Sequence, residues 1–473
     1  MSDSRESPEV RQWRPFASRV LAGVGRRDIT PEAGIRLCVW GAPDSPEIAE
    51  GVHQPLTVTA LALSGPPGEP IFLVAVDLGW WRAIDDEQSV RLPVLSALDI
   101  REERLLLHLS HTHAGPCMSH ADVARPGGDL VPEYLERVSS AIIEACHEAL
   151  DQLTPCDVTW GSGSCQLAAV RDLPCGPTDI VGFNPAQLAD DTLVVGRVCN
   201  AEGAVIATLM NYACHPTTLA WQNALLSPDF VGSAREMVES ATGAPVIFLQ
   251  GASGDLGPRD QFTGDLDVAE RNGRVLGHAT LAVLEGMPRP WRILQFAGVM
   301  ESGAPLGLWE QVPGDASTEV STQILRVPVP LQHLYSEDEL RAKWAHLGEN
   351  TANERVTRAL MLRKGYVDGS EAHHPVWITH IGDAVIVAHP GEAYSLLQTE
   401  LRRRHPDRSI LVLNCTNGPG YMYVPDRAAY ERLRYQAWQT LLGPGALEAV
   451  LEAADRAITQ LPQVRGLQEL GAQ

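Results

Sequence analysis

The sequence lacks any hydrophobic run long enough to cross a membrane. Its longest apolar stretches, such as Ile71–Val76 and Ala384–Ala388, fall far short of the ~18–20 residues that a span requires. The first twenty residues contain no apolar stretch typical of a secretory signal, so we expect none. The nine cysteines form no C-x-x-C pair, which gives little support to a zinc finger or redox site. We therefore expect free thiols and a cytoplasmic protein without a transmembrane segment.

The chain also lacks internal repeats, heptad runs, low-complexity tracts and an excess of positive charge. Its 37 Lys and Arg residues stand against 59 Asp and Glu residues, which gives a net charge of −22. This charge argues against a nucleic-acid partner, because phosphate binding needs a clustered basic surface. With 44% hydrophobic and 20% charged residues, the composition is that of an ordinary globular protein, which excludes disorder as the main state. Composition leaves the oligomeric state open.

Short apolar runs separated by Gly and Pro predict buried strands, and a hairpin is expected at Gly382 and Asp383. The predicted strands are Ile71–Asp77, Arg104–Leu109, Ala204–Asn211, Val246–Gln250, Val376–Ile381, Ala384–Ala388 and Ser409–Leu413. Helical spacing of apolar residues, together with a capping-box signature at Ser336 and Glu339, predicts several helices. They are Glu133–Leu150, Leu266–Leu284, Ala393–Arg404, Arg427–Leu442 and one that opens at Ser336. The mixture favours an α/β fold, with mixed sheets and flanking helices.

Five of the apolar runs end in a cluster of potential ligands or catalytic groups. These clusters are Ser110–Pro116, Asn211–Thr217, Gln250–Pro258, His389–Glu392 and Asn414–Pro425. Loops at strand ends are where a rigid sheet presents functional side chains, so we expect these clusters to meet. His111 and His113 lie two residues apart, and alternation along a strand predicts that both face the same side.

Taken singly, these residues are also explained by structural roles. His215 is more typical of a satisfied structural histidine, and Glu392 of an acid in the first turn of a helix. Asp255 could cap its glycine-rich turn, and Tyr423 and Tyr435 could be core aromatics. Taken together, two or three histidines, a glutamate and a water would complete a zinc site with an open position for substrate.

The ordered motifs of the chain resemble those of the neutral ceramidase family, zinc-dependent amidases that cleave the N-acyl bond of ceramides. The matching segments begin at residue 24 and extend to about residue 450, with His215 at a corresponding strand end. They are Val24–Pro31, Ser110–Pro116, Ala252–Pro258, Gly382–Glu392 and Tyr423–Tyr435. The resemblance implies a polar tail over residues 1–20 and one catalytic domain over residues 21–465. We expect no C-terminal immunoglobulin-like domain of the kind that secreted family members carry.

The resemblance also implies roles for individual residues. The zinc ligands would be His111, His215, Glu392 and Tyr423. The catalytic residues would be His113 beside the zinc-bound water, Tyr435 and Arg171 at the substrate oxygen, and Asp255 in support. Apart from the resemblance, residues 301–334 are the least regular stretch of the sequence, which predicts a substrate-facing insertion or lid. Trp80, Trp81 and Trp309 could line an acyl pocket.

One residue departs from the family pattern: Gly257 occupies the place of the family's serine in the segment around Asp255. A covalent serine mechanism is therefore not expected. The sequence favours a zinc-dependent amidohydrolase that cleaves the amide bond of an N-acylated small molecule other than membrane ceramide. The alternatives are an esterase or acyl-transfer enzyme on the same zinc site, and a non-catalytic relative that binds a lipid or a partner.

Overall fold

The structure is a computed structural model that describes residues 12–38, 40, 45–418 and 422–463. Its centre consists of two β-sheets, one of eight strands and one of five. The larger sheet has the order β14 (Val246–Gln250), β12 (Val205–Tyr212), β11 (Thr192–Asn200), β7 (Thr154–Ser164), β2 (Phe16–Asp28), β4 (Thr57–Ser64), β5 (Ile71–Val76), β6 (Leu105–Leu109). The smaller sheet has the order β18 (Val320–Val329), β20 (Glu371–Ile381), β21 (Ala384–Ala388), β23 (Ser409–Leu413), with β19 (Val367–Asp368) on β20.

The two sheets pack face to face. Alternate residues of a strand point to opposite sides of its sheet, so one apolar face of each sheet fills the core between them and the other face meets the helices. In β5, Leu73 contributes to the core between the sheets, whereas Phe72 and Val74 face the helices on the other side. Ile386 and Leu411 of the smaller sheet meet Leu73 in the same core. Strand pairing is mixed: β5 with β6, β12 with β14, and β21 with β23 are parallel, and the remaining pairs in the two sheets are antiparallel.

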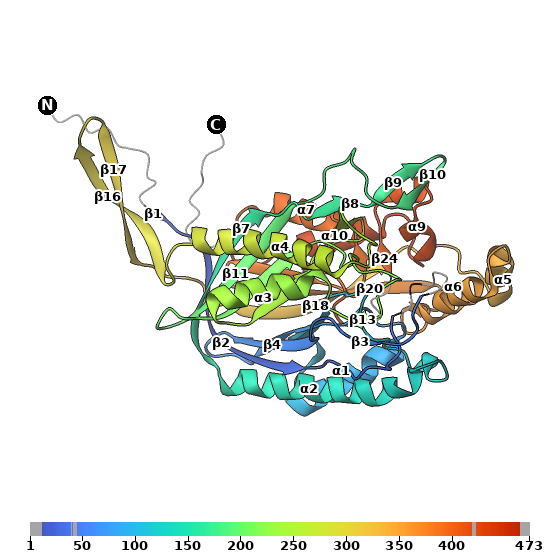
Figure 1. The fold of residues 1–473 in the computed structure, drawn as a ribbon. Helices are drawn as coiled ribbons and strands as arrows, with labels where there is room; N and C mark the ends of the chain where they lie inside the picture. The colour runs from blue at the N-terminus through green and yellow to red at the C-terminus, as the bar shows by residue number, and fades with distance from the viewer. Residues whose placement is uncertain (1–11, 39, 41–44, 419–421, 464–473) are drawn as a thin grey trace.

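Helices cover the outer face of each sheet, which makes a four-layer arrangement (Figure 1). The larger sheet is covered by α1 (Ile84–Leu98), α2 (Val131–Asp151), α3 (Phe230–Thr242) and α4 (Leu266–Gly286). The smaller sheet is covered by α7 (Leu396–Arg404) and α10 (Ala446–Thr459). The expected α/β fold of mixed sheets with flanking helices is therefore confirmed.

Local sequence signals account for several of these elements. Leu135, Val138 and Ile142 share one face of α2 and pack into the core beneath the larger sheet, as their spacing predicts. Ser336 and Glu339 form the capping box that opens α5 (Glu337–Trp344), which packs against α6 (Glu349–Met361). The expected hairpin joins β20 to β21, with Gly382 in the left-handed conformation. None of the described helices combines the length and apolarity needed to cross a bilayer.

The remaining strands are short or lie at the periphery. They are β1 (Gln12–Trp13), β3 (Gly51–Val52), β8 (Ala168–Val170), β9 (Asp172–Cys175), β10 (Thr178–Val181), β13 (Leu225–Leu226), β15 (Leu256–Pro258), β16 (Arg292–Glu301), β17 (Pro305–Pro313), β22 (Glu392–Ala393) and β24 (Tyr423–Val424). The hairpin of β16 and β17 projects from the body of the molecule at the upper left of Figure 1.

Two helix predictions near the C-terminal motifs were wrong. Glu392 does not open a helix: it lies in β22, which pairs in parallel with β24, and α7 begins only at Leu396. The stretch predicted as one helix over residues 427–442 is two short helices, α8 (Arg427–Glu431) and α9 (Tyr435–Gln439). Leu433, which has a positive φ of 49°, interrupts the helical backbone between them.

Two boundaries also differ from the sequence-based expectation. The supposed tail over residues 1–20 includes the beginning of β2, where Ala17 and Val20 are buried; residues 1–11 lie outside the described part. The supposed substrate-facing insertion over residues 301–334 contains the projecting strand β17, where Trp309 is exposed, and the internal strand β18. Only its end, at Gln332 and His333, reaches a large cavity.

Candidate metal centre

The predicted strand-end clusters meet at one place in the fold. His111 and His113 follow β6, His215 follows β12, and Glu392 lies four residues beyond β21. The side-chain nitrogens of the three histidines lie within 4.8 Å of one another. The prediction that strand alternation brings His111 and His113 together is wrong. Strand β6 ends at Leu109, before both histidines, and a positive φ of 66° at His111 turns the chain. The histidines converge although β6 and β12 lie near opposite ends of the strand order, because the larger sheet curves round: the backbone N–H of Gln250, at the end of β14, donates a hydrogen bond of 2.8 Å to Nε2 of His108 in β6.

Glu392 completes the cluster. Its Oε2 atom lies 3.0 Å from Nε2 of His215 and 3.3 Å from Nε2 of His111. All three residues are buried, whereas His113 is half-buried. The structure therefore brings together three of the four predicted ligands, and places His113 as a third nitrogen donor within reach of the same point.

The hydrogen bonds of two imidazoles fix the direction of their lone pairs. Nδ1 of His215 lies 2.7 Å from the carbonyl oxygen of Ser253, and Nδ1 of His111 lies 3.1 Å from that of Gly79. Since carbonyl oxygens only accept, we assign the proton to Nδ1 in both rings. Each Nε2 then directs a lone pair toward the same carboxylate oxygen of Glu392, an arrangement that requires a positive charge between them. A histidine held through Nδ1 by a carbonyl is the usual arrangement of a metal ligand.

The titration behaviour of the cluster indicates the same requirement. Burial raises the pKa of Glu392, but the charge of His111 outweighs it and holds that pKa well below its usual range. Burial lowers the pKa of His111, but nearby Cys415 and Glu392 raise it well above its usual value. Burial lowers the pKa of His215 to about 4 and that of His113 well below its usual range. Without a metal, a second proton on the His111 ring supplies the positive charge that balances the Glu392 carboxylate. Neutral imidazoles and an ionised carboxylate are the donors that Zn²⁺ binds.

Tyr423, the fourth predicted ligand, lies beside the cluster. The parallel register of β22 and β24 places it opposite Glu392. Its hydroxyl accepts a hydrogen bond of 3.0 Å from Nη2 of Arg171, a buried arginine that also donates to the carbonyl of Gly254 at 2.8 Å. The ring of Tyr435 packs edge-on against that of Tyr423, with 5.5 Å between centroids. Arg171, Tyr423 and Tyr435 thus form a continuous group next to Glu392.

Asp255 is not brought to the histidines by any described contact. Its carboxylate accepts hydrogen bonds of 2.7 Å from both the backbone N–H and the hydroxyl of Ser395, three residues beyond Glu392. Its carbonyl oxygen accepts from the backbone N–H of Arg171 at 2.9 Å. Asp255 therefore connects the loops that carry Arg171 and Glu392.

Aromatic side chains border the exposed side of the histidine cluster. The ring of His113 lies 4.6 Å from Trp80 and 5.0 Å from Trp40, measured between centroids. Trp81 points instead into the core, where it is 1% exposed. Of the three tryptophans that sequence placed in an acyl pocket, only Trp80 borders the site.

Sequence reasoning missed one side chain at the centre. Cys415 is buried, with its sulfur 3.6 Å from Nδ1 of His111. It belongs to the cluster that follows β23, so its position at a strand end was the available signal. The carbonyls of Gly79 and Ser253 gave no such signal, because backbone acceptors have no identity in the sequence.

Comparison with known proteins identifies relatives of this chain. The family model for neutral/alkaline non-lysosomal ceramidase, N-terminal, matches residues 20–258. A neutral ceramidase of Oryza sativa subsp. japonica is 25% identical over 239 residues, 47% of this chain and 29% of that protein. Neutral ceramidase 2 of Arabidopsis thaliana is 25% identical over 235 residues, 46% of this chain and 30% of that protein. The matched region thus spans less than a third of these two relatives.

The fold is also that of a solved structure. The crystal structure of neutral ceramidase from Pseudomonas aeruginosa superposes with a TM-score of 0.66 at 18% identity, over 93% of this chain and 74% of that one. With a family model that matches half of the sequence, these observations establish that the chain belongs to the neutral/alkaline non-lysosomal ceramidase family.

Proposed function

We propose that this chain is a zinc-dependent amidohydrolase that cleaves the amide bond of an N-acylated small molecule. In this reaction the oxygen of water bonds to the carbonyl carbon, the C–N bond breaks, and the products are a carboxylate and an amine. The observation that carries the proposal is the convergence of two imidazole lone pairs on one carboxylate oxygen of Glu392. Membership of a family whose named relatives are ceramidases supports amide chemistry.

The residues that would hold zinc are His111, His215 and Glu392, with Tyr423 next to them as the fourth ligand. Zinc bound there would lower the pKa of a water molecule toward neutrality and polarise a carbonyl group. The Nδ1 hydrogen bonds of the two histidines hold their rings in the orientation that ligation needs.

The other residues of the site have the properties that proton transfer and charge stabilisation require. His113 is held neutral by burial, so it can accept the proton that the attacking water loses and pass it to the leaving amine. Arg171 presents a buried positive charge to the Tyr423 hydroxyl, next to Tyr435. We assign Arg171 and Tyr435 to the stabilisation of the oxyanion that develops on the substrate carbonyl. Trp40 and Trp80 offer an apolar wall to the substrate beside His113.

The test combines metal analysis with single substitutions. Purified, untagged protein should contain close to one zinc per chain by elemental mass spectrometry. His111→Ala, His215→Ala and Glu392→Ala should each lose zinc and amidase activity, whereas His147→Ala, at an exposed position on α2, should keep both. Full zinc content and activity in all three site variants would contradict the assignment.

The substrate assay uses N-acyl amides, ceramide among them, and ester analogues with the same acyl chains. Faster cleavage of the amides supports the amidohydrolase, and faster cleavage of the esters supports the alternative esterase. Absence of metal even after reconstitution with zinc would favour the non-catalytic relative. The feature that supports this alternative is Gly257, which stands where the family has a serine. A Cβ at Gly257 would lie 2.8 Å from Oε1 of Gln261, so the Gln261 side chain occupies the space beside it.

A further inference from the structure

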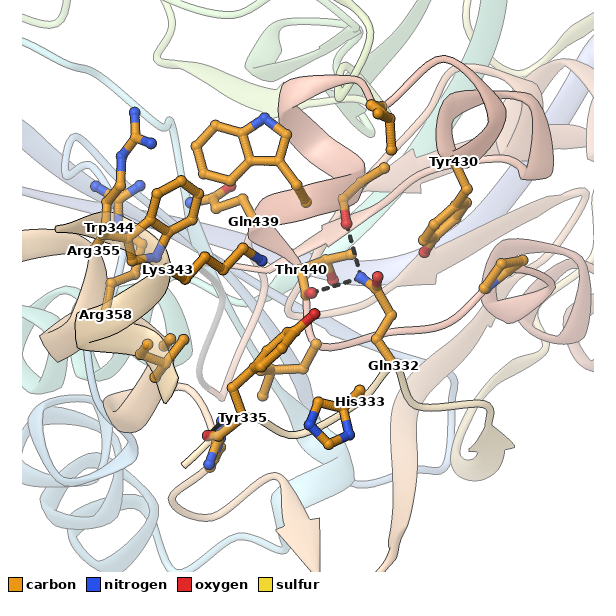
Figure 2. A pocket seen from close by; sticks show the side chains of 18 residues that line it. Gln332, His333, Tyr335, Lys343, Trp344, Arg355, Arg358, Tyr430, Gln439 and Thr440 are labelled. Carbon is orange, nitrogen blue, oxygen red and sulfur yellow. Dashed lines mark hydrogen bonds between the residues drawn. The ribbon is translucent and has the colours of Figure 1, made fainter. Parts of the chain in front are cut away.

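A cavity of about 450 Å³ lies next to the candidate active site. Figure 2 shows it between the helices that carry Lys343 and Arg355 and the segment that carries Tyr430 and Thr440. Its volume is within the ~300–1,000 Å³ typical of small-molecule sites. The mechanism proposed above assigns it no role.

The cavity is strongly cationic in a chain whose net charge is −22. Lys343, Arg355 and Arg363 line it, together with Arg358, and no Asp or Glu is among its described lining residues. Within the described part of the chain, Lys343, Arg355 and Arg363 form no ion pair with a carboxylate, whereas Arg358 pairs with Glu354. Burial lowers the pKa of both Lys343 and Arg355, because each cation is partly removed from water without a counter-charge.

Aromatic rings hold two of these cations in place. The guanidinium of Arg355 lies 4.6 Å from the ring centroids of both Trp344 and Trp438. The ammonium of Lys343 lies 4.5 Å from the ring of Tyr335. Cation–π contacts orient a cation without neutralising it, so its hydrogen-bond donors remain available to a ligand. The cavity is thus built from fixed positive groups with flat apolar walls.

The wall of the cavity contacts the tyrosine pair of the candidate active site. Trp438, in its wall, packs edge-on against Tyr435 at 5.1 Å between ring centroids. Arg358 donates a hydrogen bond of 3.4 Å from Nη1 to the Tyr435 hydroxyl. Tyr435 in turn packs against Tyr423, which lies beside Glu392. A substrate whose carbonyl lies at Tyr435 could therefore reach the cationic cavity with a substituent.

We propose that this cavity binds an anionic group of the substrate, so that the preferred substrates are N-acylated compounds that carry a carboxylate, sulfonate or phosphate. The inference rests on the proposed amidohydrolase function and specifies its substrate class. Arg355 and Lys343 bind the anion, and Trp344 and Trp438 pack against the part of the substrate that leads to it. The anion belongs either to the amine portion or to the far end of the acyl portion.

The experiment compares matched pairs of amides in the zinc-loaded enzyme. One pair is N-hexanoylglycine and its neutral counterpart N-hexanoylglycinamide, which places the anion on the amine portion. The other is an adipic acid monoamide of ethylamine and the corresponding neutral diamide, which places it on the acyl portion. We expect kcat/KM to be at least tenfold higher for the anionic member of one pair, which also identifies the portion that carries the anion. Equal values within both pairs would overturn the proposal.

Substitutions connect the preference to the cavity. Two variants test this: the single variant Arg355→Gln and the double variant Arg355→Gln, Lys343→Gln. In each, kcat/KM for the anionic amide should fall at least tenfold more than kcat/KM for its neutral counterpart. The change should be chiefly an increase in KM. The matched control is Arg341→Gln, which lies on α5 like Lys343, does not line the cavity and pairs with Glu337. An anion preference that survives in the Arg355 and Lys343 double variant would refute the assignment to this cavity.

A binding measurement separates this inference from the proposed function. The sulfonamides N-(butylsulfonyl)glycine and N-(butylsulfonyl)glycinamide are not cleaved, and Trp344 and Trp438 report on occupancy through tryptophan fluorescence. We expect tighter binding of the anionic sulfonamide, lost in Arg355→Gln and kept in Arg341→Gln. If no amide is hydrolysed but this pattern holds, the amidohydrolase proposal fails and the anion site stands. If amides are hydrolysed but the sulfonamides bind alike, the anion site is wrong.

Discussion

Replacing His215 by alanine should remove most of the stabilisation that bound zinc would give to the folded chain. His215 is fully buried, its Nδ1 is held by the carbonyl oxygens of Ser253 and Leu256, and its Nε2 faces Glu392. These contacts form only in the folded chain, so zinc held at this site would bind the native state in preference to the unfolded one. A ligand of this kind stabilises the protein by an amount set by its free concentration relative to its Kd.

The magnitude follows from mass action and chain length. At a free zinc concentration 100 times the Kd, the native state gains about 2.7 kcal/mol. The 473 residues correspond to an unfolding entropy of about 1 kcal/mol per kelvin, so Tm should rise by about 3 °C. If the loss of His215 weakens affinity about 100-fold, as loss of an outer partner can, the same zinc concentration stabilises by only about 0.4 kcal/mol. The shift then falls to about 0.4 °C.

Differential scanning calorimetry with and without zinc measures both shifts. Each variant is compared with itself, so the cost of the substitution to folding cancels. His147→Ala, whose side chain is exposed on α2, is the matched histidine control and should show the full shift. A zinc-dependent shift in His215→Ala as large as that of the wild type would refute the placement of the metal.

Further substitutions probe the neighbouring groups. Arg171→Met should lower kcat for amide hydrolysis by about 10²–10³-fold with unchanged zinc content, because it removes the charge that faces Tyr423; a kcat within threefold of wild type would contradict its role. Gly382→Ala should lower the free energy of unfolding in urea by about 2–4 kcal/mol, since φ is +59° and a Cβ would lie 2.9 Å from Cα of Ser18; an unchanged midpoint would disprove this. Burial raises the pKa of Asp255 to about 7, above its unfolded value, so its stabilising contribution is complete below pH 4 and is lost as pH rises through 7. Relative to Asp255→Asn, the wild type should lose up to about 4 kcal/mol of unfolding free energy between pH 4 and 8, measured by urea titration.

Local sequence patterns were sufficient to predict those helices that their own residues specify. The spacing of apolar residues in α2 and the Ser336–Glu339 capping box give these helices directly, since one face or one cap decides each. The pattern failed at residues 427–442, where the positive φ of Leu433 interrupts the helix, and at Glu392, where a partner distant in sequence decides the conformation. Glu392 is extended because it pairs with Tyr423. This pairing forms only when the folded chain brings the two segments side by side.

The residue types of the candidate site followed from the sequence: histidines, a glutamate, tyrosines and an arginine at strand ends. Their assembly did not, because His111, His215 and Glu392 are separated by more than a hundred residues along the chain, and only the packing of two sheets brings them within about 3 Å. The carbonyls that fix the two imidazole tautomers belong to the backbone, which no sequence pattern identifies. Likewise, Lys343 and Arg355 are ordinary helix cations in the sequence. Only the tertiary structure sets them around a cavity that no described Asp or Glu side chain lines.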